Sequence, residues 1–264
     1  MLQYIYACMR HRALPWNFFQ LNSRYFSEYK GIFSKLEMDD LVPSQWRLEQ
    51  YHYDKKVVPR TFPVFIKPEW GQNSAGIVRV DTEKQYRDVR RQICKNGIPF
   101  IVQQAAPGEE EYEIYYLRSP SVHGDFASLF ITQVKNRSGT RHPINSIHNP
   151  DTGYIDITAT LSSRELVKIW QYLEGIGDFR MARVCVKADS KNDLIQGEFH
   201  IVEMNVFLPM PLVLLAQNID YDQKRHLVRE MMTIAAQLVK TVPAEYTGKS
   251  IFFRKMKAHY GMKR

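Results

Sequence analysis

Apolar runs alternate along the chain with polar, turn-prone stretches, and this pattern predicts an α+β fold. Apolar residues at helical spacing predict helices over 81–93, 163–173 and 220–239, and Ser34 begins a shorter helix that ends before Pro43. No internal repeat is visible, and we expect mostly antiparallel strands. Strands rich in β-forming residues are expected at 61–67, 77–80, 99–104, 112–118, 126–134, 181–186 and 199–204.

Three regions lack a clear period. Residues 1–33 hold seven aromatic residues from Trp16 to Phe33, and we interpret them as a packing cover. Residues 135–152 form the longest expected loop, and long loops in compact domains are often functional. A polar turn at 190–197 is expected to join the last two strands. In the helix over 163–173, the expected inner face carries Leu166, Val167, Trp170 and Leu173.

The composition describes a globular protein with a basic surplus. With 264 residues, 44% of them hydrophobic, the chain can bury a core as one large domain or two coupled lobes. The 36 Lys and Arg residues exceed the 28 Asp and Glu residues, and the net charge of +8 suits anionic partners. Part of the surplus lies at Arg254, Lys255, Lys257, Lys263 and Arg264, either as a solvated tail or as a contact for nucleic acid or an anionic membrane.

Cys8, Cys94 and Cys185 show no CxxC spacing, so neither a disulfide framework nor a zinc site is indicated. A reducing cytoplasm fits this pattern best. The first apolar stretch is interrupted by Arg10 and Arg12 too early for a secretion signal, and no segment reaches the length of a membrane span.

The sharpest motif is F-I-K-P-E-W-G-Q-N-S-A-G-I, in which a strand delivers Lys67 beside a glycine-rich turn. Gly71 and Gly76 would let the backbone approach a polyphosphate, whose oxygens would accept hydrogen bonds from backbone N–H groups and Ser74. Lys67 supplies a positive charge. A plain hairpin is the alternative interpretation.

A second motif, H-I-V-E-M-N, places Glu203 and Asn205 on the same face of a strand. Their oxygens suit Mg²⁺, which binds one or two carboxylates together with substrate phosphates. Arg183 on the preceding strand would lie opposite and stabilise developing negative charge. A surface strand with two polar residues is the alternative.

These motifs, together with V-Q-Q-A-A-P-G-E-E-E-Y-E-I-Y-Y-L-R and A-R-V-C-V-K, occur in an order that resembles the ATP-grasp superfamily, in its D-alanine–D-alanine ligase-like branch. The resemblance covers roughly residues 34–211. It implies two lobes of mostly antiparallel sheet flanked by helices, with ATP between them and Mg²⁺ or Mn²⁺ as the metal.

The resemblance also implies roles for individual residues. Arg183 and Lys67 would be catalytic, Arg183 facing the acyl-phosphate and the tetrahedral intermediate, and Glu203 and Asn205 would hold the metal. Arg118 and Lys135 would lie near substrate or phosphate. The nucleotide would be bound by Lys35, Lys67, Gly71, Ser74, Gly76, Gln103, Gln104, Ala106 and Glu111, with the hinge strand from Gln103 to Ala106 against adenine and Glu111 at the ribose.

The chain departs from the family in two places. The strand of Arg183 normally reads Arg-x-Asp with the aspartate on a metal, whereas this chain has Cys185, and a neutral thiol is a poor Mg²⁺ ligand. The site would then hold one metal ion, or Asp189 or a water molecule would replace the missing aspartate ligand. Only about 33 residues precede Lys35, so the usual front domain is reduced to a cover or remnant, or a partner chain or second copy completes the site.

The sequence therefore predicts a cover at 1–33, an ATP-grasp domain at 34–245 and a basic tail at 246–264. The expected activity is ATP-dependent joining of a small carboxylate to an amine through an acyl-phosphate, with ADP and phosphate released. Cys185 leaves a nucleotide-binding pseudoenzyme or regulatory subunit as the alternative. The net charge of +8 leaves an RNA- or membrane-surface-binding module as a further alternative.

Overall fold

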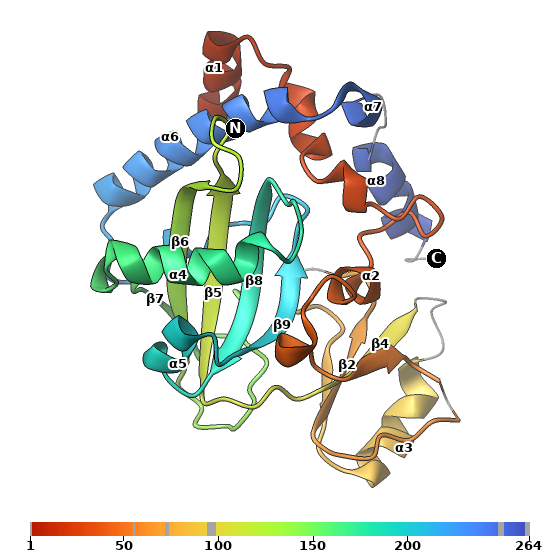
Figure 1. Cartoon of the computed structure of the whole chain (residues 1–264). Coiled ribbons are helices and arrows are strands. Elements are labelled where there is room, and N and C mark those ends of the chain that lie inside the picture. Colours follow the sequence, from red (N-terminus) through yellow and green to blue (C-terminus); the bar gives the residue numbers. More distant parts are fainter. Residues whose placement is uncertain (1, 55, 72–73, 94–98, 248–250, 262–264) are drawn as a thin grey trace.

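Two antiparallel sheets form the framework of the protein. The computed structural model describes residues 2–54, 56–71, 74–93, 99–247 and 251–261. The smaller sheet has the strand order β1-β4-β2-β3, and the larger sheet has the order β7-β6-β5-β8-β9 (Figure 1). Every strand pair in both sheets is antiparallel, as expected. The strands are β1 (Gln50–His52), β2 (Val64–Pro68), β3 (Val78–Val80), β4 (Phe100–Gln104), β5 (Glu110–Arg118), β6 (Phe126–Asn136), β7 (Thr152–Asp156), β8 (Met181–Ala188) and β9 (His200–Asn205).

Helices cover both sheets, and helices from the two ends of the chain pack against each other. The helices are α1 (Leu2–His11), α2 (Lys35–Asp39), α3 (Glu83–Ile93), α4 (Ser163–Glu174), α5 (Lys191–Gln196), α6 (Tyr221–Leu238), α7 (Ala244–Thr247) and α8 (Ile251–Gly261). Short 3₁₀ turns lie at η1 (Pro15–Gln20), η2 (Ser23–Tyr25), η3 (Ser44–Trp46), η4 (Thr158–Thr160), η5 (Leu212–Leu215) and η6 (Val239–Thr241). In the described part of the chain, no helix is both long and apolar enough to cross a membrane.

The two faces of the larger sheet have different environments because side chains alternate along a strand. Even-numbered residues of β5 and β8, such as Ile114, Tyr116 and Val184, form the main core with Trp170 and Leu173 of α4. On the opposite face, Tyr115 packs with Leu117, α1 and α6 in a second core. The rest of that opposite face is polar and is left open toward the smaller sheet.

The smaller sheet has a much smaller core, in which Val64, Ile66, Val80 and Val102 pack against Tyr86 of α3. The side chain of Thr82 accepts a hydrogen bond from the backbone N–H of Gln85, which confirms the helix start expected there. Cys94 lies outside the described residues.

The N-terminal cover is part of the larger lobe. The apparently aperiodic first residues form α1, which packs along α6, and Tyr4 and Cys8 are buried in the second core. Asn22 then donates hydrogen bonds to the carbonyls of Met181 and Val206. The cover is therefore built into the same core as the strands.

Other expectations need correction. Residues 190–197 contain α5, with Ser190 as N-cap and Gly197 in the left-handed region, instead of a turn alone. Val167 is exposed, and Ile169 takes its place on the inner face of α4. The expected C-terminal tail contains α8, whose Ile251 is fully buried in the main core. A solvated tail is thus the wrong description of the part of 246–264 that the structure describes.

Candidate functional site

The open face of the larger sheet collects the polar residues of three strands. Glu113 of β5 lies opposite Cys185 of β8, and Cys185 lies opposite Glu203 of β9, so the three side chains form one row across the sheet. Arg183 is paired in the same way with Asn205. The predicted opposition of Arg183 to the E-x-N motif is confirmed.

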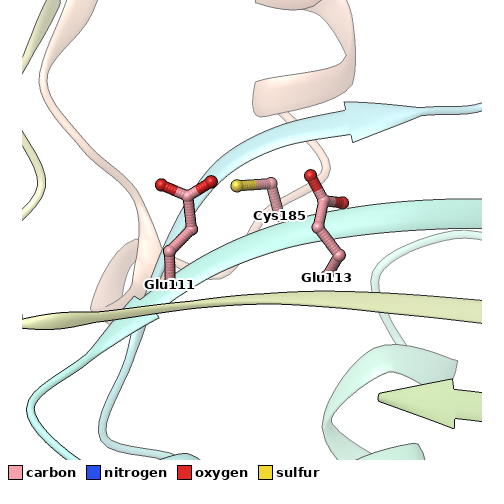
Figure 2. A group of neighbouring side chains, drawn as sticks. All are labelled: Glu111, Glu113 and Cys185. Atoms are coloured by element: carbon pink, nitrogen blue, oxygen red, sulfur yellow. The ribbon is translucent and has the colours of Figure 1, made fainter. Parts of the chain in front are cut away.

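Cys185 lies between two carboxylates of β5. Figure 2 shows Glu111 and Glu113 on either side of its thiol, and one ligand atom from each of the three residues lies within 4.8 Å of the others. Burial raises the pKa of the Cys185 thiol well above its usual value, and the neighbouring carboxylates raise it further. The thiol is consequently neutral near pH 7.

Glu113 and Arg183 form a buried ion pair in the same face. Glu113 Oε2 lies 3.2 Å from Arg183 Nε, although the two atoms are not aligned as a hydrogen bond. Burial raises the pKa of Glu113 to about 7, even though the charge of Arg183 opposes this shift. Arg183 also donates a hydrogen bond of 3.0 Å to the carbonyl of Met210, which fixes the guanidinium toward the sheet.

Two lysines lie near Glu203, one on the smaller sheet and one on helix α2. Ser34 caps α2, and the first residue of that helix, Lys35, places Nζ 3.3 Å from Glu203 Oε1. Lys67 on β2 is buried and donates hydrogen bonds to Gln103 Oε1 at 2.8 Å and to the Val202 carbonyl at 3.2 Å. The motifs around Lys35, Lys67 and Glu203 therefore meet in space.

For each of these groups, burial and the nearby opposite charge shift the pKa in opposite directions. Burial lowers the pKa of Lys67 to about 8, against the attraction of Glu203. Burial alone would raise the pKa of Glu203, but Lys35 and Lys67 hold it below its usual value. Glu203 is thus ionised, while the charge of Lys67 is only partly compensated.

Gln103 holds Lys67 in place in addition to lining the site. Its amide accepts from Lys67 and donates to the Val202 carbonyl at 3.1 Å, so its polar atoms are already occupied by protein groups. Val202 is the extra residue where the pairing of β8 and β9 shifts register. Its carbonyl therefore receives hydrogen bonds from both side chains.

A cavity of about 1000 Å³, including its open mouth, lies between the two sheets. Of the residues expected to act, those that line it are Lys67, Ser74, Gln103, Gln104, Ala106, Glu111, Arg183 and Glu203. Lys35 lines a smaller cavity that shares Lys67 and Glu203 with the larger one. Asn205 lines neither of these two cavities, and its buried amide nitrogen has no hydrogen-bond partner among the described residues.

The long polar loop after β6 closes one side of the cavity and contributes residues 142–147 to its wall. Asn145 donates a hydrogen bond of 3.0 Å to Glu111, and its carbonyl accepts one of 2.9 Å from Ser74. The loop thereby links the glycine-rich turn of one lobe to the sheet of the other. Its predicted importance for the site agrees with this position.

The glycine-rich turn is only partly described, because residues 72–73 are outside the described ranges. Gly76 has φ +75°, and a Cβ there would lie 3.1 Å from Pro68 Cγ, so the turn requires glycine at this position. Gly71 has ordinary backbone geometry and space for a Cβ. The role of Gly71 in approaching phosphate stays a prediction.

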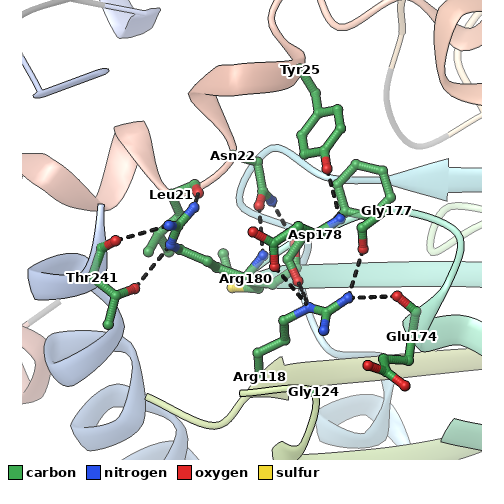
Figure 3. A network of polar contacts seen from close by, with 12 residues as sticks. Leu21, Asn22, Tyr25, Arg118, Gly124, Glu174, Gly177, Asp178, Arg180 and Thr241 are labelled. Carbon is green, nitrogen blue, oxygen red and sulfur yellow. Dashed lines mark hydrogen bonds and ion pairs between the residues drawn. The ribbon is translucent and has the colours of Figure 1, made fainter. Parts of the chain in front are cut away.

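Arg118 does not reach the cavity, which corrects its expected position. Its guanidinium donates hydrogen bonds to the carbonyls of Glu174, Gly177 and Phe179 (Figure 3). It also lies over the ring of Trp170. It therefore fixes the turn between α4 and β8. Lys135 is half exposed, 3.4 Å from Glu110, and lines a neighbouring cavity that shares Glu111 and Asn145 with the main one.

The cavity residues absent from the expected set include Glu113, Asn145 and Lys187. The alternation E-Y-E at 111–113 was a visible signal that Glu113 shares the face of Glu111. Lys187 likewise follows Arg183 and Cys185 at a spacing of two. Asn145 had no such signal, because its position depends on how the long loop folds.

No family model and no curated protein sequence matches the chain. The structure is similar to VanG D-Ala:D-Ser ligase from Enterococcus faecalis, with a TM-score of 0.54 and 14% identity over 83% of this chain and 69% of that one. It is similar to D-alanine–D-alanine ligase from Bacillus anthracis, with a TM-score of 0.52 and 12% identity over 85% and 69% of the two chains.

L-amino acid ligase from Bacillus licheniformis gives a TM-score of 0.47 and 16% identity over 75% of this chain, which spans 47% of that ligase. The first two similarities establish that the chain has the fold of D-alanine–D-alanine ligases, the ATP-grasp fold. The fold expected from the ordered motifs is confirmed.

Proposed function

We propose that this ATP-grasp chain is an ATP-dependent ligase that joins a carboxylate to an amine through an acyl-phosphate. The observation that carries the proposal is the meeting of Lys35, Lys67 and Glu203 at the smaller cavity that adjoins the main cavity between the lobes. Solved ligases that share the fold act on amino acids, as their names state. A phosphorylated carboxylate can be attacked by an amine with release of phosphate.

The lysines would bind the nucleotide phosphates. Lys67 is buried, and no carboxylate of the described residues lies within hydrogen-bond distance of it, so a phosphate oxygen would supply the missing negative charge. Lys35 would exchange part of its contact with Glu203 for the transferred phosphoryl group. Phosphoryl transfer depends mainly on such positioning and charge stabilisation.

The donor set fits one Mg²⁺ ion, held by Glu203 and Asn205. Glu203 is ionised, Asn205 lies two residues away on the same face, and carboxylate and amide oxygens are the donors that Mg²⁺ prefers. When bound, the ion would neutralise charge on the phosphates. The neutral thiol of Cys185 does not suit a second Mg²⁺.

Arg183 would stabilise the oxyanion that develops when the amine attacks the acyl-phosphate. Its guanidinium lines the cavity and is held by Glu113 and the Met210 carbonyl. Since ATP activates the carboxylate, the proposed reaction needs no covalent nucleophile from the protein.

The direct test is ADP release by the purified protein against pools of carboxylates and amines, with Mg²⁺ and with Mn²⁺. We expect ADP formation that requires one acid and one amine together, and mass spectrometry should detect the joined product. ATP binding without any substrate-dependent ADP release across the pools would contradict the proposal.

The second candidate is a nucleotide-binding pseudoenzyme or regulatory subunit, and the neutral Cys185 between Glu111 and Glu113 favours it. In that case ATP would bind and stabilise the protein, but ADP would not form with any acid and amine pair. The same screen therefore separates the two candidates.

A further inference from the structure

Helix α8 brings a lysine into the interior, close to the proposed phosphoryl-transfer site. The helix is docked by Ile251 in the main core, by Phe252 against Phe19 at a ring separation of 4.7 Å, and by an ion pair from Arg254 to Glu28. Figure 1 shows α8 beside the N-terminal segment, on the side of the molecule where α2 lies. Lys255 on this helix is only 7% exposed.

The ammonium of Lys255 lies between two segments of the chain, one that follows Asn205 and one that follows Lys67. Its Nζ is 3.6 Å from the ring centroid of Phe207, two residues after Asn205, and 5.0 Å from that of Trp70, three residues after Lys67. Aromatic faces stabilise a cation only partly. The structure shows no carboxylate paired with Lys255 in the described part of the chain.

The surrounding charges leave Lys255 uncompensated. Lys35 of α2 is near enough to repel it, and burial together with this repulsion lowers the pKa of Lys255 to about 7. Lys35 itself is paired with Glu203. Glu69, beside Trp70, is already bound by Lys30 and Ser34.

A buried, unpaired ammonium is costly, so a position of this kind suits an anion that binds from outside. We propose that Lys255 binds the carboxylate of a monocarboxylic acid substrate at the Lys35–Glu203 end of the cleft, opposite the nucleotide cavity. This inference rests on the proposed ligase function and specifies its acid subsite. One carboxylate matches the single positive charge of Lys255, since Glu203 is paired with Lys35 and Glu69 with Lys30.

The choice of a carboxylate over a phosphate follows from the surroundings. Phe207 and Trp70 present ring faces instead of N–H donors, whereas a phosphate oxygen would find Lys67 and the glycine-rich turn on the other side of Glu203. A carboxylate held here would have its oxygens beside Lys35, where the phosphoryl group would arrive.

The test uses the full chain without nucleotide, with propionate and inorganic phosphate as probes at constant ionic strength. Lys255→Met keeps the aliphatic stem and removes the charge, and Lys240→Met at an exposed position is the matched control. We expect propionate to bind the wild type and the control about tenfold more tightly than Lys255→Met, the effect of one charge-assisted hydrogen bond.

Proton uptake gives a second measurement that a packing role would not produce. An anion at Lys255 raises its lowered pKa, so at pH 7.5 propionate binding should take up protons in the wild type, measured by calorimetry in buffers of different ionisation enthalpy. This uptake should be absent in Lys255→Met. The unliganded variant should melt no lower than the wild type, since the buried charge that it loses is stabilised only partly by the rings of Phe207 and Trp70.

Equal propionate binding in the wild type and Lys255→Met, or no binding to either, would overturn the proposal. Lys255-dependent binding of phosphate without propionate would overturn the carboxylate assignment. Because nucleotide is absent from these titrations, they can fail while substrate-dependent ADP release persists. Conversely, propionate can bind at Lys255 in a protein that forms no ADP, which would reject only the ligase function.

Discussion

Lys67 is the residue on which the proposed nucleotide site depends most directly. Lys67→Ala should weaken ATP binding by a factor of ten or more, because it removes a charge-assisted contact to phosphate worth roughly 1.5 to 3 kcal/mol. Calorimetric titration with ATP measures the effect, with Lys84→Ala on the exposed face of α3 as the control. Unchanged affinity in Lys67→Ala would place the phosphates elsewhere.

Cys185 tests whether the site is weakened by a missing carboxylate. Cys185→Asp places a fourth acid beside Glu111, Glu113 and Glu203, so the unliganded protein should melt at a lower temperature through like-charge repulsion. The added oxygen donor should give a larger stabilisation by Mg²⁺·ATP than in the wild type, since a ligand stabilises by RT ln(1 + [L]/Kd).

Cys185→Ser is the control for this substitution, because it replaces the thiol without adding a charge. Melting curves of the three proteins with and without Mg²⁺·ATP give the comparison. A smaller Mg²⁺·ATP effect in Cys185→Asp than in Cys185→Ser would reject the interpretation of Cys185 as a lost metal ligand.

Glu113 should make stability depend on pH. Its pKa rises from 4.5 to about 7 on folding, so the folded state binds the extra proton between these values and the contribution to stability falls as pH rises from 4.5 to 7. Glu113→Gln should therefore stabilise the protein more at pH 8 than at pH 5, with a difference on the order of 3 kcal/mol. Denaturant unfolding at the two pH values measures it, and an equal effect at both would contradict the assigned shift.

At the residue scale, the site was predictable where a motif and a strand period coincide. Lys67, Glu203 and Arg183 come from such motifs, and the structure brings them to one cavity. Arg118 belongs to the same strand as Glu111, but the far end of β5 is covered by the turn after α4. Its position depends on which part of a sheet face stays open, and a one-dimensional pattern does not contain that information.

The side chain of Arg118 binds three carbonyls at the end of α4 and in the turn before β8. Arg118→Met removes donors from the carbonyls of Glu174, Gly177 and Phe179, and the buried carbonyls should cost about 3 kcal/mol or more of unfolding free energy. Arg164→Met on the exposed side of α4 is the control, and urea unfolding measures both. ATP affinity should not change in Arg118→Met, and a loss without destabilisation would return Arg118 to the site.

At the element scale, the long periodic segments were predictable, as were the short β3 and α2, whereas other short elements were not. The strands at β2, β4, β5, β6, β8 and β9 and the helices α3, α4 and α6 agree with their apolar patterns. The three-residue β1 and five-residue β7 are too short to show alternation, and tertiary pairing with β4 and β6 defines them. Helix α1 was hidden because its aromatic residues are distributed around both buried and exposed faces.

At the scale of the whole molecule, the two ends of the chain complete the larger lobe. Arg180, beside β8, donates to Leu21 of the N-terminal segment and to Thr241 near the C-terminal helices (Figure 3). The N-terminal segment and the turn η6 after α6 are thus tied to the strand that carries Arg183 and Cys185. The domain boundaries expected at residues 34 and 245 were placed from the motifs. The packed larger lobe also includes residues before residue 34 and after residue 245.

The lobes should differ in local stability, because the described core of the smaller sheet is one cluster of five buried hydrophobic residues, whereas the larger sheet lies between two extended cores. Amides of β2 and β4 should therefore exchange with deuterium faster than those of β5 and β8, which report opening of the larger lobe. A nucleotide that contacts both lobes should slow exchange in β2 and β4 most, since opening of the small lobe would first require its release. Lys67→Ala should lose this protection at the same ATP concentration, while the exchange of β5 and β8 stays as slow as in the wild type. If ATP protected only the larger sheet, the nucleotide would bind outside the cleft between the lobes.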